Sequence, residues 1–123
     1  MDQPDGKRLL IVVRRAPYGS SLARTALDTA LAAAAFDQPV DLLFLGDGVL
    51  QLQAGQDTAA LGLKNCGRLL ASLPLYDIDK VYADAAAVER YGLPIDQTPV
   101  PAELLDHQAM AELMANCDHL LGF

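Results

Sequence analysis

The chain has 123 residues, which suffice for one domain that buries a core without metals or disulfides. An apolar share of 52% excludes a disordered chain, and a net charge of -7 argues against direct nucleic-acid binding, which needs a cationic surface. No apolar run reaches the roughly 18 residues of a membrane span, the amino terminus lacks a signal-peptide pattern, and there is no CxxC pair. We therefore expect a cytoplasmic protein with free thiols and no membrane partner.

The first part of the chain predicts a strand followed by a helix. Residues 1–7 are expected to form a flexible leader before a single domain over residues 8–123. An apolar run between basic residues at 8–14 predicts the first strand, which we place at the centre of the sheet. A loop with proline and glycine follows, and it ends in a serine suited to cap a helix over about 21–35.

A continuous apolar run over residues 40–45 predicts a second strand, parallel to the first and buried on both faces. It stops at Gly46, Asp47 and Gly48, where two glycines permit a tight turn or a close approach to other backbone. Open α/β sheets usually bind ligands and partners at the carboxyl ends of their strands. Asp47 is therefore a candidate site residue, although aspartate is also a preferred turn residue.

A second apolar segment follows this turn directly. Its side chains have no obvious place in the core of the preceding strand, so they either pack beneath a loop or face another chain. We expect them to help cover a partner subunit, with Tyr76 nearby, as apolar and aromatic side chains do in permanent interfaces. These candidate interface residues are Val49, Leu50 and Leu52.

The rest of the chain continues the alternation of helices and strands. In chain order, the predicted elements are a helix over about 58–72, a strand over 80–83, a short helix over 84–91, a strand over 97–101, a helix over 106–116 and a strand over 118–123. Gly92 is suited to end the short helix, and prolines restrict the strand over 97–101 to an edge. This pattern predicts an α/β fold, a three-layer sandwich in which helices flank a mostly parallel sheet of about five strands.

The candidate nucleophiles are the two thiols, Cys66 and Cys117. A reactive thiol needs a pKa lowered by nearby cations or by a helix N-terminus. Lys64 and Arg68 flank Cys66 in the sequence, but residues two apart do not share one helix face. Because free cysteines are mostly buried small hydrophobes, packing is the favoured interpretation of both thiols.

A second candidate site combines Asp47 with the loop at Tyr18, Gly19 and Ser20, which lies at a strand-to-helix junction and is placed to offer amide groups to an anion. The loop lacks the lysine of a P-loop, and the Gly-x-Gly turn after the second strand lacks the third glycine of a dinucleotide motif. His107 and His119 are not spaced for metal ligation. We therefore expect neither a cofactor nor a metal, and we keep a small-molecule or anion-binding module as an alternative.

Three short elements adjoin the predicted strands: Ala16-Pro17-Tyr18-Gly19 after the first, the segment FLGDGVLQL over 44–52 after the second, and Leu75-Tyr76-Asp77-Ile78 before the third. Together they resemble the DsrE/DsrF-like sulfurtransferase family, and within it the TusC (DsrF) branch, over about residues 9–123. The resemblance implies a cytoplasmic sulfur-relay complex with TusB-like and TusD-like subunits, arranged as a dimer of heterotrimers. Such a complex takes persulfide sulfur from a donor protein and passes it to an acceptor, towards 2-thiolation of the tRNA wobble uridine.

One position departs from the catalytic pattern of that family. The resemblance places the sulfur-accepting cysteine of TusD-like subunits at the end of the third strand, which falls at about Ala83 in this chain, next to Asp84. A persulfide forms on neither side chain, because a thiolate must act as nucleophile and carrier. The resemblance therefore implies a non-catalytic, structural subunit. A persulfide carrier that uses Cys66 or Cys117 is the alternative.

Overall fold

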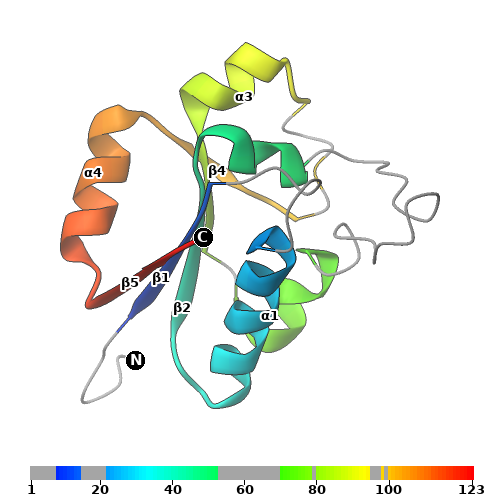
Figure 1. Ribbon diagram of the computed structural model, residues 1–123, viewed down its shortest axis with the longest axis vertical. Helices are drawn as coiled ribbons and strands as arrows, with labels where there is room; N and C mark the ends of the chain where they lie inside the picture. Colours follow the sequence, from blue (N-terminus) through cyan, green and yellow to red (C-terminus); the bar gives the residue numbers. More distant parts are fainter. Residues whose placement is uncertain (1–7, 15–21, 53–69, 79, 95–97, 99) are drawn as a thin grey trace.

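Five parallel strands form one sheet that has helices on both faces (Figure 1). The computed structural model describes residues 8–14, 22–52, 70–78, 80–94, 98 and 100–123. The strands are β1 (Leu9–Val13), β2 (Val40–Phe44), β3 (Val81–Asp84), β4 (Glu103–Leu105) and β5 (His119–Gly122), in the spatial order β4-β3-β2-β1-β5. The helices are α1 (Leu22–Ala35), α3 (Ala85–Tyr91) and α4 (His107–Asn116), with 3-10 helices η1 (Gly46–Leu52) and η3 (Leu73–Tyr76).

The sheet separates two hydrophobic cores. Side chains alternate between the faces of a strand, so in β2 Leu42 and Phe44 point to one face and Leu43 to the other. The larger core lies beneath α1, α3, η1 and η3, and the smaller core lies beneath α4. Figure 1 shows α1 and α4 on opposite sides of the sheet. The predicted α/β sandwich with a mostly parallel sheet flanked by helices is thereby confirmed.

The predicted short helices begin and end at residues suited to those positions. Asp84 is the N-cap of α3, where its carboxylate accepts a hydrogen bond from the Ala87 amide at 3.4 Å. Gly92 ends the helix with a φ of 63°, as predicted. Asp106 caps α4 in the same way and accepts from the Ala109 amide at 2.8 Å.

Two strand predictions need correction. The fourth strand is not at 97–101, because the described residues of that range, Thr98, Val100 and Pro101, form no strand, and β4 begins at Glu103. β4 does lie at an edge of the sheet, as the prolines before it had led us to expect for the fourth strand. The first strand, β1, is an inner strand but not the central one, since β5 pairs with its second side and β2 occupies the middle.

Several predictions fall wholly or partly outside the described residues. They concern the leader at 1–7, the loop with Tyr18 and Gly19, the thiol of Cys66, and most of the helix predicted at 58–72, of which residues 70–72 are described and helical. Among the described residues, no helix is long and apolar enough to cross a membrane.

Candidate functional site

The Gly-Asp-Gly turn joins the carboxyl ends of β1 and β2, and its two glycines serve different purposes. Gly46 has a φ of 56°, a left-handed conformation that glycine adopts without strain. Gly48 lies against the end of β1, where a β-carbon would stand only 1.9 Å from the carbonyl oxygen of Val13. That same carbonyl accepts a hydrogen bond from the Leu45 amide at 2.9 Å, which fixes the turn beside β1.

The apolar segment after the turn folds back as η1. Val49 and Leu52 are fully buried in the larger core, so the expectation that they cover a partner subunit is wrong for these two side chains. They follow the alternative of packing beneath a loop. Leu50 is half-buried, and Tyr76 is exposed on η3.

The end of β3 carries a carboxylate where the resemblance implied a thiol in catalytic subunits. Ala83 is fully buried between Phe44 of β2 and Leu104 of β4, so its side chain faces core rather than solvent. Asp84 follows at the rim of the sheet, and its carboxylate accepts from the Gly46 amide at 3.1 Å in addition to capping α3. The Asp84 side chain thereby links the start of η1 to the first turn of α3, and it offers no sulfur atom.

Asp47 connects η1 to α3. Its carboxylate accepts a short hydrogen bond from the hydroxyl of Tyr91, and both side chains are exposed. This hydrogen bond is the main reason why the pKa of Tyr91 is raised, and the nearby charge of Asp47 adds to it. The Arg90 guanidinium lies over the Tyr91 ring, 5.2 Å from its centroid, and it partly opposes the rise in pKa. Asp47 therefore lies in the predicted turn and links it to the end of α3 through Tyr91.

The described thiol lies at the opposite edge of the sheet. Cys117 is half-buried at the end of α4, where its thiol donates to the Met114 carbonyl at 3.2 Å. The next residue, Asp118, donates its amide to the Arg8 carbonyl at the amino end of β1. A strand of this length separates that edge from Asp84 by roughly 15 Å. The structure therefore does not bring Cys117 to the implied sulfur position.

The histidines do not extend the candidate site. His107 is exposed at the start of α4, and His119 is exposed at the start of β5. Over the described part of the chain, no group of three or more histidine, cysteine, aspartate or glutamate side chains is placed to hold a metal ion.

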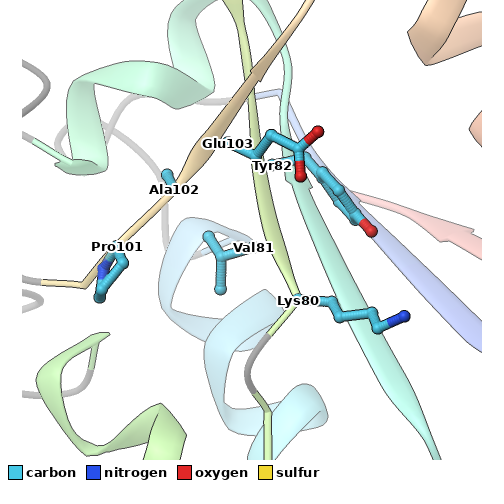
Figure 2. A pocket seen from close by; sticks show the side chains of 6 residues that line it. All are labelled: Lys80, Val81, Tyr82, Pro101, Ala102 and Glu103. Carbon is cyan, nitrogen blue, oxygen red and sulfur yellow. The ribbon is translucent and has the colours of Figure 1, made fainter.

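A shallow open groove of about 420 Å³ lies along the beginnings of β3 and β4 (Figure 2). Its lining residues are Lys80, Val81, Tyr82, Pro101, Ala102 and Glu103. Figure 2 shows the side chains of Lys80, Tyr82 and Glu103 on one side of the strands and Val81 on the other. The groove contains none of the site residues predicted from the sequence.

The sequence interpretation missed a partly buried ion pair. The guanidinium of Arg8 holds the carboxylate of Asp41 through two hydrogen bonds, of 2.5 and 3.1 Å. The side chain of Asp41 is only 9% exposed, and a buried carboxylate usually has such a partner. The available signal was an aspartate inside a strand predicted to be buried on both faces.

Comparisons with known proteins identify relatives of similar length. The Pseudomonas aeruginosa protein named "Protein TusC homolog" is 40% identical over 113 residues, which cover 92% of this chain and 95% of that protein. The Allochromatium vinosum protein named "Intracellular sulfur oxidation protein DsrF" is 36% identical, and the match covers 95% of this chain and 96% of that protein.

A solved structure gives independent support for the fold. The crystal structure of the ychN protein from E. coli superposes with a TM-score of 0.83 at 21% identity, over 95% of this chain and 99% of that one. The model of the DsrE/DsrF-like family matches residues 7–123. The parallel five-stranded sheet, its Gly-Asp-Gly turn and this match over nearly all of the sequence lead to one conclusion: the chain belongs to the DsrE/DsrF-like family.

Proposed function

We propose that this chain is a non-catalytic, structural subunit of a cytoplasmic sulfur-relay complex. In this proposal it assembles with TusB-like and TusD-like subunits as a dimer of heterotrimers. The complex receives persulfide sulfur from a donor protein and passes it on towards 2-thiolation of the tRNA wobble uridine. The TusC and DsrF relatives support the sulfur-relay role.

The observation that carries the proposal is the chemistry at the end of β3. Sulfur transfer requires a thiolate that attacks the donor persulfide and then holds the sulfur atom. Ala83 is buried there, and the carboxylate of Asp84 accepts hydrogen bonds from two backbone amides. The chain retains the scaffold of a sulfur-transfer protein without the carrier atom at this position.

The position of Cys117 supports the same conclusion. Its thiol lies at the amino edge of the sheet and donates to a backbone carbonyl of its own helix. A sulfur carrier there would have to exchange with partners on the side of the molecule remote from Asp84. Cys66 lies outside the described residues, so its part in sulfur transfer is decided by experiment.

The test measures 2-thiouridine in bulk tRNA by mass spectrometry in a strain from which the gene has been deleted. The strain receives the unmodified gene, an empty vector, or a Cys66→Ser/Cys117→Ser double variant. We expect the empty vector to lack the modification and the double variant to restore it, because assembly needs the fold and not the thiols.

Two outcomes would contradict the proposal in different ways. A double variant that assembles but leaves tRNA unmodified would make one thiol a sulfur carrier, and the single variants would identify which one. Unchanged tRNA in the strain with the empty vector would exclude a role in this thiolation pathway.

A further inference from the structure

An exposed apolar patch lies at the amino edge of the sheet, opposite the carboxyl edge described above. It consists of Phe36, Leu75 and Tyr76, which we call the amino-edge patch. Phe36 is 87% exposed and Leu75 is 83% exposed, values that exceed those of every other exposed large hydrophobic residue in the described part of the chain. Tyr76, next to Leu75 in the chain, is 44% exposed. Large apolar side chains that are exposed at the same edge of a domain often mark an interaction surface.

The topology of the sheet brings the three residues to the same edge. Phe36 lies in the connection from α1 to β2, and Leu75 and Tyr76 lie in η3, which precedes β3. β2 and β3 are neighbouring parallel strands, so both connections reach the same edge. α1 and η3 also contact each other, and Figure 1 shows η3, in light green, beside the lower half of α1.

Both aromatic residues are presented on fixed turns of the same kind. Asp37 follows Phe36 with a φ of 64°, and Asp77 follows Tyr76 with a φ of 63°. Among the described residues these are the non-glycine positions with positive φ. Their amides close the turns through hydrogen bonds to Ala34 at 2.9 Å and Pro74 at 3.1 Å. The left-handed conformation carries a steric cost for a residue with a β-carbon. Each turn therefore has one defined conformation, and in each the preceding aromatic residue is exposed.

The charge beside the patch indicates what covers it. Asp37 and Asp77 place two carboxylates at its rim, in a chain whose net charge is already -7. A second copy of this chain would bring two further carboxylates to the same contact, and like charges across an interface disfavour association. We infer that the amino-edge patch is a docking surface for a different protein chain, whose matching surface is apolar at its centre and carries lysine or arginine at its rim. The inference rests on the proposed function in one respect only, namely that the different protein chain is the TusB-like or the TusD-like subunit.

The test is the assembly of the complete protein with its co-expressed TusB-like and TusD-like subunits, followed by native mass spectrometry and size-exclusion chromatography. A Phe36→Ser/Leu75→Ser/Tyr76→Ser variant removes the apolar centre. A Leu120→Ser/Leu121→Ser variant is the matched control, because these leucines are also exposed but lie on β5, beyond β1. Circular dichroism checks that each variant is folded. We expect the triple variant to lose at least about 100-fold in affinity, because aromatic anchors dominate interface energies, and the control to assemble normally.

A second variant tests the charge without disturbing the turns. Asparagine tolerates the left-handed conformation about as well as aspartate, so Asp37→Asn/Asp77→Asn removes the two charges and keeps the turns. We expect this variant to bind its partner several-fold more weakly, with a smaller loss of affinity on addition of salt than the unmodified protein shows.

Normal assembly of a folded triple variant would overturn the inference while the proposed function stands. An unchanged salt dependence in the asparagine variant would also overturn it, even if the triple variant failed to fold. A homodimer of the unmodified chain that the triple variant abolishes would assign the patch to a second copy instead. If the unmodified chain assembles with neither subunit, the proposed function fails, and the inferred partner fails with it.

Discussion

The carbonyl oxygen of Val13 lies 1.9 Å from the place where a β-carbon on Gly48 would stand. Backbone atoms at the end of a buried strand have little freedom to move, so glycine at position 48 is required by space rather than by φ. Gly46, two residues earlier, has open space around its missing side chain but a positive φ.

The two glycines therefore predict different substitution costs. Gly48→Ala should lower the free energy of unfolding by about 3 kcal/mol, since a new methyl group must displace backbone. Gly46→Ala should cost about 1 kcal/mol for strain in φ alone, and Gly46→Asn should cost less. Urea denaturation of the three variants checks the order. Equal losses at both positions would show that the β1 carbonyl moves aside.

Asp84 predicts a local effect at a distant amide. Asp84→Ala removes both the cap of α3 and the acceptor for the Gly46 amide, and it should cost about 1–2 kcal/mol of stability. Hydrogen exchange should then show faster exchange of the Gly46 amide. Asp84→Asn, which keeps an acceptor oxygen, is the control and should retain most of the protection. Unchanged exchange at Gly46 in Asp84→Ala would rule out the connection between η1 and α3 through this side chain.

The hydrogen bond from Tyr91 to Asp47 predicts a pH dependence. Because the pKa of Tyr91 is raised in the folded protein, mainly by this bond, its stabilising effect is complete below the unfolded pKa of about 10. The effect is lost as the pH rises through the higher folded value. The difference in stability between the unmodified protein and Tyr91→Phe should therefore be constant at neutral pH and shrink at strongly alkaline pH.

Asp47→Asn provides the control for this titration. Alkaline difference absorbance, measured against the matching Tyr91→Phe background, gives the pKa of Tyr91 in each protein. We expect a lower pKa in Asp47→Asn, because the charged acceptor has been removed. An identical pKa in the two proteins would mean that the hydrogen bond does not persist in solution.

The ion pair between Arg8 and Asp41 predicts a penalty for an isolated carboxylate. Arg8→Ala should cost about 1–3 kcal/mol, less than for a fully buried pair because the Arg8 side chain is 41% exposed. The backbone bond from Arg8 to Asp118 is unaffected by this substitution. Urea denaturation of Arg8→Ala, Asp41→Asn and the double variant gives the coupling. Additive losses would show that the pair contributes nothing of its own.

Local sequence patterns predicted most of the elements. Apolar runs located β1 and β2, and Asp84 with Gly92 bounded α3 within one residue of its observed start and end. The misplaced fourth strand shows the limit of such patterns. Val100 is the more β-prone residue, yet Glu103–Leu105 forms the strand because it pairs with Tyr82–Asp84 of β3. Whether a short edge segment becomes a strand depends on the strand beside it, and the sequence of the segment alone does not show that neighbour.

The candidate site was only partly predictable for a similar reason. The turn at Gly46 and Gly48 and the absence of a thiol near Ala83 were evident from the residues. The partners were not, because Asp84 reaches Gly46 across 38 residues and Tyr91 reaches Asp47 across 44. Val49 and Leu52 were misassigned because one apolar segment can cover a partner or fold back as η1, and only the path of the backbone distinguishes the two.

The pairing of β1 with β5 has a consequence for synthesis on the ribosome. Leu9 in β1 lies opposite His119 in β5. The hydrogen bonds between β1 and β5 therefore cannot form until almost the whole domain has emerged from the exit tunnel. Until then the nascent β1–β2–β3 half-sheet presents an unpaired apolar edge, the kind of surface that chaperones bind and that aggregates readily. β1 is therefore made before the other strands of the sheet but is among the last of them to have both of its sides paired.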